Sequence, residues 1–317
     1  MVFITLLICL FTIELIVRVF YDSFSNYNLE MWRYSKELKI PLENDNLPFV
    51  HLPGSSAFLY GTQITTDSSG FRVNDYTLNS SENSDKILFL GDSFTLGWGV
   101  PYDSTFSHIL EKWFSKENKK IRSINAGCGN YNTIMEVELF KIKGVQLNPK
   151  IVVLVYYIND IEDTPKRLSS FRYYVMTNFY LYGYLFDKYA KLKSKYDIGF
   201  KNNYYSTNYT DRNKKYGNVN AITELANICK RENIKLLVVN IPDLRKLDDY
   251  PYSFATEHIK QTAISLNIEF LDLYHSIKSH KPENLWVSPE DPHANSIANY
   301  IFALAMMNKL NELGWIK

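Results

Sequence analysis

Cysteine and net charge are both scarce in this sequence. Among 317 residues there are only three cysteines, Cys9, Cys128 and Cys229, so we expect no disulfide framework, and this count excludes neither an oxidising nor a reducing compartment. Lysine and arginine number 35 against 34 aspartates and glutamates, which leaves a formal net charge of +1 and no concentrated basic stripe. The chain lacks the electrostatic footprint of a nucleic-acid-binding surface, and we expect no nucleic-acid partner.

Two catalytic sequence patterns are also missing. In the stretch GDSFTLGWG at residues 91–99, Thr95 stands where a Gly-x-Ser-x-Gly nucleophile elbow has its second glycine. The same stretch lacks the Gly-Lys-Ser/Thr ending of a phosphate-binding loop. The sequence therefore argues against an enzyme of the α/β-hydrolase type and against a P-loop nucleotide-binding protein.

What is present begins with a long apolar run. Residues 2–17, VFITLLICLFTIELIV, are apolar apart from two threonines and one glutamate, and a bilayer span needs about 20 such residues. No basic stretch precedes the run and no small-residue cleavage site is obvious, so we expect an uncleaved membrane anchor over residues 1–21. The basic residues near this segment all follow it: Arg18, Arg33 and Lys36. By the positive-inside tendency alone, they would keep the rest of the chain in the cytoplasm.

The next stretch, residues 22–85, contains no long periodic segment. Within it, residues 64–73 are typical of two short strands around a Ser-Ser-Gly turn. We expect residues 22–85 to form a lead-in segment that packs on the main domain.

From residue 86 onward, predicted strands alternate with predicted helices in the manner of a parallel sheet. Runs such as IVVLVYYI carry no polar face, as expected of strands that are buried on both sides. The expected strands are residues 87–90, 122–126, 151–158, 235–241 and 268–273. Helical apolar faces lie between them, and a last helix is expected over residues 295–313. We therefore expect a three-layer α/β/α domain over residues 86–317 with a parallel five-stranded sheet.

An aromatic-rich insertion, residues 165–216, interrupts this alternation. It is longer than the single helix that a doubly wound unit needs, and it holds many of the 24 tyrosines. Phe179, Tyr182 and Phe186 fall on one helical face, whereas Leu181 and Leu185 fall on another. Because a helix that is apolar on two sides needs two partners, we expect extra core or a dimer contact first. A lid over a site, or an aromatic platform for sugar rings or a bilayer surface, are the functional alternatives.

Polar residues follow the ends of the predicted strands. Gly91-Asp92-Ser93 follows the first strand, the glycine-rich stretch NAGCGNYNT at residues 125–133 follows the second, and Asn159-Asp160 ends the third. The stretch SPEDPHAN at residues 288–295 precedes the last helix. Carboxyl ends of parallel strands meet at one edge of a sheet, where ligands are bound. We expect a hydroxyl, backbone donors, an amide and an acid–histidine pair to lie together there.

These four motifs, in this order, resemble the four blocks of the SGNH (GDSL-type) hydrolases. The resemblance covers residues 86 to 313, and the N-terminal apolar run followed by Gly-Phe-Arg at residues 70–72 also looks like membrane-attached bacterial members. It implies a flavodoxin-like α/β/α fold and the hydrolysis of an acyl ester through an acyl-serine intermediate. It implies no metal or organic cofactor.

The resemblance also implies roles for particular residues. Ser93 would be the nucleophile and His293 its base, with an acid beside His293. The oxyanion would be held by the Ser93 N–H, a backbone N–H of the second loop and the Asn159 side-chain amide.

Two positions depart from the family's pattern. The family's glycine in the second block falls at Asn130, with Gly129 one place earlier, so both are candidate oxyanion donors. The family's acid lies three residues before the histidine, which is Glu290, whereas Asp291 lies two before. We favour Asp291, because it is short and Pro292 restricts its backbone, and keep Glu290 as the alternative.

Three further residues have structural explanations. Cys128 and Cys229 are expected to be small core residues, and His108 lies on a helix rich in apolar residues.

The function expected from these observations is a membrane-anchored serine esterase acting on an acyl ester, such as an O-acetyl group, of an envelope glycan or lipid. Its catalytic domain is expected outside the cytoplasm, as the family resemblance suggests. An acyltransferase to a glycan hydroxyl and a catalytically inactive glycan-binding relative are the alternatives.

Overall fold

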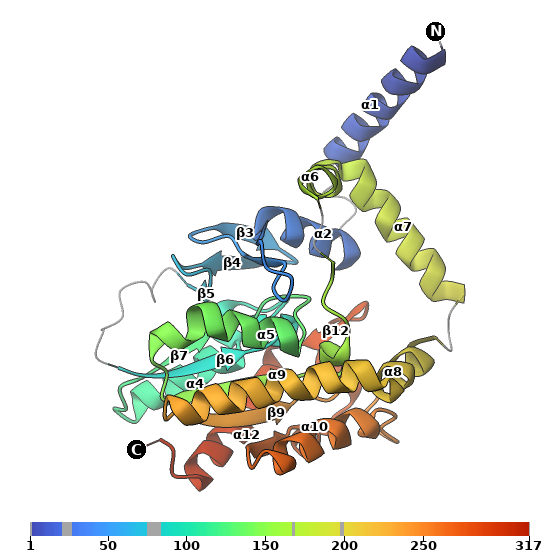
Figure 1. Cartoon of the computed structure of the whole chain (residues 1–317). Helices are drawn as coiled ribbons and strands as arrows, with labels where there is room; N and C mark the ends of the chain where they lie inside the picture. The colour runs from blue at the N-terminus through green and yellow to red at the C-terminus, as the bar shows by residue number, and fades with distance from the viewer. Residues whose placement is uncertain (1, 21–26, 75–83, 167–168, 197–199, 317) are drawn as a thin grey trace.

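A mixed eight-stranded sheet forms the centre of the computed structural model, which describes residues 2–20, 27–74, 84–166, 169–196 and 200–316. The strand order is β10-β9-β8-β6-β7-β5-β4-β3, and Figure 1 shows the sheet between layers of helices.

One part of the sheet is parallel and holds all five strands that the sequence predicts. They are β6 (Asp85–Leu90), β7 (Ile121–Asn125), β8 (Ile151–Tyr156), β9 (Lys235–Asn240) and β10 (Glu269–Asp272). Each pairs in parallel with its neighbours in the order β7-β6-β8-β9-β10. Every residue of the central strand β8 is buried, as its unbroken apolar sequence predicts.

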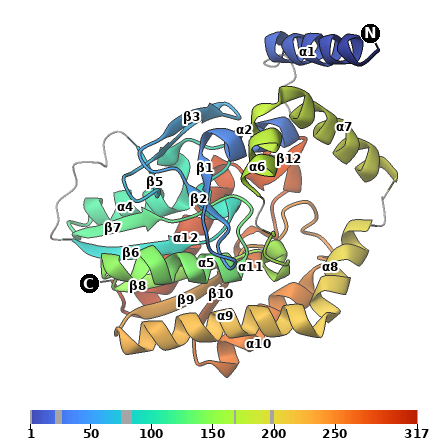
Figure 2. The same ribbon diagram turned by 45° about the horizontal axis from the view of Figure 1, so that its top comes forward.

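Helices cover both faces of this parallel part and confirm the three-layer prediction. On one side α4 (Phe106–Lys116) packs against α12 (Ser296–Glu312). On the other, α9 (Arg212–Arg231) lies against α5 (Thr133–Leu139), and α10 (Ser253–Ser265) packs along β9 and β10. Figures 1 and 2 show α5, α9 and α10 together on one face. The apolar sides of these helices close one large core around the sheet.

The expectation of a five-stranded sheet is wrong, because the lead-in segment adds three antiparallel strands. These are β3 (Ser56–Leu59), β4 (Thr62–Thr66) and β5 (Arg72–Val73), and β5 pairs with the edge strand β7. The two short strands predicted around the Ser-Ser-Gly turn are β4 and β5. Their pairing covers the backbone edge of β7, which would otherwise present unpaired N–H and C=O groups.

Other elements of the lead-in lie beside this extension. Helix α2 (Tyr27–Glu37) packs against β3, and β1 (Lys39–Pro41) pairs antiparallel with β2 (Phe49–His51). A small second cluster of buried side chains joins the lead-in to the segment after β6, and includes Tyr34, Leu59 and Trp98. The lead-in is therefore part of the folded body.

Short elements complete the described chain. They are α3 (Ser93–Leu96), α11 (Tyr274–Ile277), the hairpin strands β11 (Trp286–Ser288) and β12 (Asp291–Ala294), the single turns η3 (Tyr102–Ser104), η5 (Val145–Leu147), η6 (Ile158–Ile161) and η7 (Pro282–Asn284), and a π-helical turn η4 (Phe140–Gly144).

The insertion consists of three helices with different surroundings: α6 (Ser170–Asn178), α7 (Tyr180–Tyr196) and α8 (Phe200–Thr210). Helix α8 joins the core, where the Tyr209 hydroxyl bonds that of Tyr156 at 2.7 Å. Helices α6 and α7 lie against α2, and α7 also contacts α1 (Val2–Phe20). They keep large side chains exposed, namely Phe171, Tyr174, Phe179, Leu185, Tyr189 and Leu192.

Helix α1 stands out from the body in Figure 1. Residues 2–19 are long and apolar enough to cross a membrane, and most of their side chains are exposed.

Candidate active site

The predicted nucleophile Ser93 begins α3 directly after β6, and Asp92 caps that helix. The Asp92 carboxylate accepts a hydrogen bond from the Phe94 N–H at 2.8 Å, and a weaker one from the Ser93 hydroxyl at 3.4 Å. Only glycine fits at position 91, because a Cβ there would lie 2.0 Å from Thr95 Oγ1. Gly91 thus lets the chain turn sharply and leaves Ser93 at the carboxyl edge of the sheet.

Ser93, His293 and Asp291 form a continuous hydrogen-bonded line. The Ser93 Oγ lies 2.8 Å from His293 Nε2, and His293 Nδ1 lies 2.5 Å from Asp291 Oδ1. The other oxygen of the buried Asp291 carboxylate accepts from the Trp98 indole N–H at 3.0 Å. The carboxylate therefore has a fixed orientation, with one oxygen on the imidazole and the other on the indole.

Glu290 lies outside this line. Its side chain is exposed and accepts from the Ser288 hydroxyl at 3.3 Å. Both acids lie next to or in the β11–β12 hairpin, whose antiparallel pairing has a shift between Trp286 and Ser288. In this hairpin Asp291 points to the imidazole and Glu290 to solvent.

Among the N–H groups of residues 126–131, all of which the structure describes, that of Asn130 alone has no acceptor within this part of the chain. The occupied ones are those of Ala126 to Phe89 O (2.9 Å), Gly127 to Asn125 Oδ1 (3.0 Å), Cys128 to Gly91 O (3.0 Å), Gly129 to Tyr34 Oη (2.9 Å) and Tyr131 to Cys128 O (3.1 Å). The Asn130 N–H has no acceptor in the described part of the chain, and Asn130 is exposed with φ +69°. Of the two candidates, Asn130 offers a donor and Gly129 does not.

The loop packs tightly against the nucleophile turn. A Cβ at Gly127 would lie 2.2 Å from the Leu96 backbone nitrogen, so the two backbones can approach only with glycine there. The Asn125 side chain ties them further by donating to Thr95 O at 2.6 Å.

Two side chains of the lead-in, those of Lys39 and Tyr34, bond the backbone of the second loop, and His51 supports Tyr34; sequence reasoning missed all three. The Lys39 ammonium donates to Gly129 O at 2.6 Å and to Asn130 Oδ1 at 3.1 Å. The buried Tyr34 hydroxyl accepts from the Gly129 N–H and bonds His51 Nε2, while His51 Nδ1 lies 3.1 Å from Gly70 O. The bonds of Lys39 and Tyr34 to Gly129 join residues 90 and 95 positions apart, so no local pattern in the sequence could indicate them.

The third strand end places Asn159 beside the nucleophile turn. Its side-chain NH₂ donates to Asp92 Oδ2 at 3.3 Å. The next residue, Asp160, is buried near Glu136. Burial raises the pKa of both carboxyls well above the usual range, and the negative charge of Asp92 raises them further. Burial therefore favours the neutral form of both Glu136 and Asp160.

Aromatic rings surround the imidazole. The ring centroids of Phe94 and Tyr27 lie 4.9 and 5.7 Å from that of His293. Phe94 in turn lies 4.4 Å from Tyr157, whose hydroxyl donates to Asp243 at 3.0 Å. Such apolar neighbours strengthen electrostatic interactions within the site, because they exclude water from it.

The three residues with structural explanations lie where those explanations place them. Cys229 is buried in the core, and burial raises its pKa to about 12. Cys128 is buried near Tyr34 and Tyr131, and burial raises the pKa of its thiol. His108 lies 3.2 Å from Asp103, away from Ser93. Within the described ranges, no group of three His, Cys, Asp or Glu side chains could hold a metal ion.

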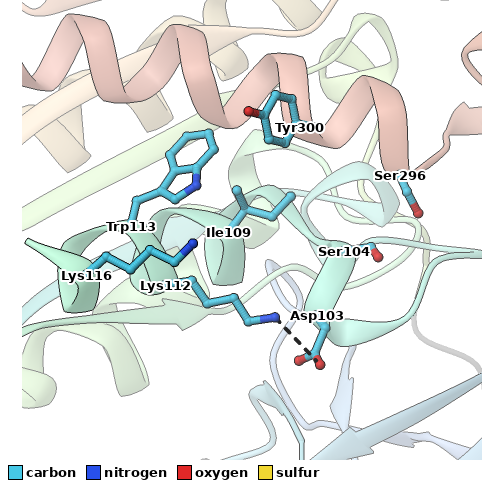
Figure 3. A pocket seen from close by; sticks show the side chains of 8 residues that line it. All are labelled: Asp103, Ser104, Ile109, Lys112, Trp113, Lys116, Ser296 and Tyr300. Atoms are coloured by element: carbon cyan, nitrogen blue, oxygen red, sulfur yellow. Dashed lines mark ion pairs between the residues drawn. The ribbon is translucent and has the colours of Figure 1, made fainter.

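A surface hollow of about 350 Å³ lies apart from the Ser93–His293–Asp291 line. Figure 3 shows it between α4 and α12, lined by Trp113 and Tyr300 with lysines at one side.

Comparisons with known proteins give only distant similarities of structure. No protein-family model matches the chain, and no curated protein matches it. It is similar to a solved structure titled TesA, at 13% identity over 72% of this chain and 99% of that one, with a TM-score of 0.48. A catalytic mutant of Axe2, an acetylxylan esterase from Geobacillus stearothermophilus, has 15% identity over 75% and 99% and a TM-score of 0.48. The acetyl xylan esterase AlAXEase has 16% identity over 71% and 99% and a TM-score of 0.44.

Proposed function

We propose that this chain is a serine ester hydrolase of the SGNH type. The observation that carries the proposal is the hydrogen-bonded line from the Ser93 hydroxyl through His293 to the buried Asp291. A serine hydroxyl becomes nucleophilic when an imidazole takes its proton, and a carboxylate on the other ring nitrogen fixes the tautomer and stabilises the imidazolium.

The proposed reaction has two halves. Ser93 Oγ attacks the ester carbonyl and its proton passes to His293 Nε2. The tetrahedral intermediate then expels the alcohol, which takes the proton from His293 Nε2, and an acyl-serine remains. Water attacks the acyl-serine with His293 again as base, and the carboxylic acid leaves. In both halves the oxyanion would accept from the Ser93 N–H, the Asn130 N–H and the Asn159 amide.

The proposed substrate is an acyl ester, for example an O-acetyl ester, of an envelope glycan or lipid. The apolar helix α1 supports this, since a helix able to span a membrane would keep the enzyme beside the envelope. We place the catalytic domain on the extracytoplasmic side, where such polymers are found.

Trapping the nucleophile tests the proposal. A fluorophosphonate probe should label the full-length protein on Ser93, and Ser93→Ala should abolish both labelling and hydrolysis of an activated acetyl ester. The control is Ser296→Ala, an exposed serine at the start of α12, which should leave both unchanged. Near-normal turnover by Ser93→Ala would overturn the proposal.

The same assay separates hydrolysis from transfer. With a glycan acceptor present, an esterase should release free acid at an unchanged rate. Loss of free acid with acetylated glycan as the product would identify an acyltransferase, and the absence of both products would identify a binding protein.

A further inference from the structure

We infer that Lys39 is a positioning residue that strengthens the oxyanion hole through the peptide bond between Gly129 and Asn130. The inference rests on the proposed function, and it assigns a role to the lead-in segment, from which Lys39 comes.

The geometry centres on one peptide group. Gly129 C=O and Asn130 N–H are the two ends of a single peptide unit, and the Lys39 ammonium lies 2.6 Å from that carbonyl oxygen. A cation on the oxygen draws electron density away from the nitrogen, because the peptide is conjugated. The Asn130 N–H therefore becomes a stronger donor at its free end, toward an oxyanion.

Lys39 also holds the residue that replaces the family's glycine. Asn130 has φ +69°, a left-handed conformation that asparagine tolerates better than most residues. Its Oδ1 accepts from the Lys39 ammonium at 3.1 Å, so the same cation that polarises the peptide also fixes the side chain. Tyr34 completes the arrangement by accepting from the Gly129 N–H at 2.9 Å, which fixes the preceding peptide unit.

The ammonium lies in a buried, ring-lined place. Lys39 is 5% exposed, and its Nζ lies 4.4 Å from the ring centroid of Tyr34 and 4.3 Å from that of Phe49. Aromatic faces attract a cation and exclude water, and a hydrogen bond is electrostatically stronger without water. An ammonium placed this way acts on the Gly129 carbonyl with little screening.

Lys39 has a pKa of about 8, and burial shifts the pKa values of the titratable groups nearest to it away from 8. Burial lowers the pKa of Lys39 to about 8. Burial lowers the pKa of His51 to about 3, and it raises those of Tyr34 and Cys128 above their usual values. The cations beyond His51 are Arg72 and Lys143. As pH rises through about 8, Lys39 loses its proton and the Asn130 N–H loses its polarisation, so kcat should fall.

The test compares Lys39→Gln with the wild type in full-length protein, using an activated acetyl ester over pH 6–10. Deleting a whole oxyanion donor costs about 100- to 1000-fold in rate, so weakening one should lower kcat about 10- to 100-fold with KM within about twofold. The alkaline fall of kcat near pH 8 should be present in the wild type and absent in Lys39→Gln. The matched control is Lys36→Gln on α2, which should change neither kcat nor the alkaline fall.

The outcomes separate this inference from the proposed function. A wild type without Ser93-dependent hydrolysis overturns the proposed function and the inference with it. Ser93-dependent hydrolysis without an alkaline fall near pH 8 overturns the inference alone, even if Lys39→Gln fails to fold. A Lys39→Gln variant that loses kcat but keeps the alkaline fall would assign Lys39 a purely structural role, which also contradicts it.

Discussion

At the scale of single residues, the hydrogen bonds around His293 support Asp291 as the proposed acid. Asp291 has one oxygen on the imidazole at 2.5 Å and the other on the Trp98 indole at 3.0 Å, so its carboxylate cannot rotate without losing a bond. Glu290 points to solvent. The three-residue spacing typical of SGNH hydrolases would favour Glu290, so the catalytic role of Asp291 stays a prediction that rests on these contacts.

Exchanging each acid for its amide tests this assignment. Asp291→Asn should lower kcat by about 10⁴-fold, because an amide no longer selects the imidazole tautomer that accepts the Ser93 proton. Glu290→Gln is the matched control and should change kcat little. Steady-state kinetics on one activated ester decide between them: the opposite ranking would give the role to Glu290, and two small losses would indicate a Ser–His dyad.

At the scale of elements, the lead-in segment holds the nucleophile turn in place. The buried Arg72 on β5 donates to the backbone carbonyls of Leu96, Gly97 and Val100, at 2.5, 2.7 and 2.8 Å. These carbonyls belong to Leu96, the last residue of α3, and to the turn after it, and α3 begins at Ser93. The Arg72 guanidinium bonds backbone carbonyls rather than a carboxylate, and burial lowers its pKa to about 10.

Removing this guanidinium should destabilise the protein. Arg72→Met removes the donors of the buried Leu96 and Val100 carbonyls, whereas Gly97 O keeps the Val100 N–H at 3.2 Å. At about 1 kcal/mol for each unpaired carbonyl, the low end because a buried charge is also removed, the free energy of unfolding should fall by about 2 kcal/mol. Arg231→Met is the control, since the exposed Arg231 at the end of α9 bonds the exposed Glu232 and its loss should cost under about 1 kcal/mol. Denaturant unfolding followed by fluorescence measures both, and equal losses would contradict the argument.

The strands of the sheet differ in how well the sequence predicts them. The five parallel strands were predictable, because strands buried on both faces leave continuous apolar runs such as that of β8. Strands β4 and β5 were predicted as a short pair, but no local pattern indicates that β5 joins the edge strand β7. Strand β3 was not predicted, so the sheet was predicted too small. Ser93 and His293 could be named because their motifs are local. Lys39, Tyr34 and Arg72 act across long separations in the chain and leave no local pattern.

At the scale of the whole molecule, α1 carries more of the exposed large apolar side chains than any other described element. Its side chains Val2, Phe3 and Phe11 are each more than 60% exposed, which is costly in water and expected in a bilayer. Helices α6 and α7 of the insertion carry the next exposed apolar side chains and lie beside α1.

Protease treatment of intact spheroplasts tests the proposed orientation. The full-length protein should remain in the membrane fraction, and protease added outside should digest its catalytic domain while a cytoplasmic marker protein survives. Complete protection of the domain until the membrane is lysed would support the opposite topology, which the positive residues after α1 favour.

The bonds between α1 and the insertion affect how far the candidate active site can lie from a membrane. Glu14 of α1 accepts from the N–H groups of Tyr180 and Leu181 at 3.0 and 2.8 Å, and Arg18 donates to Asn178 O at 3.0 Å. Trp32 of α2 donates to Met176 O at 2.6 Å, which joins the insertion to the body. With α1 in a bilayer, these bonds would attach the folded body rigidly to the membrane and hold Ser93 at a fixed distance from the lipid. The proposed enzyme would then act on esters that come to that fixed distance from the lipid.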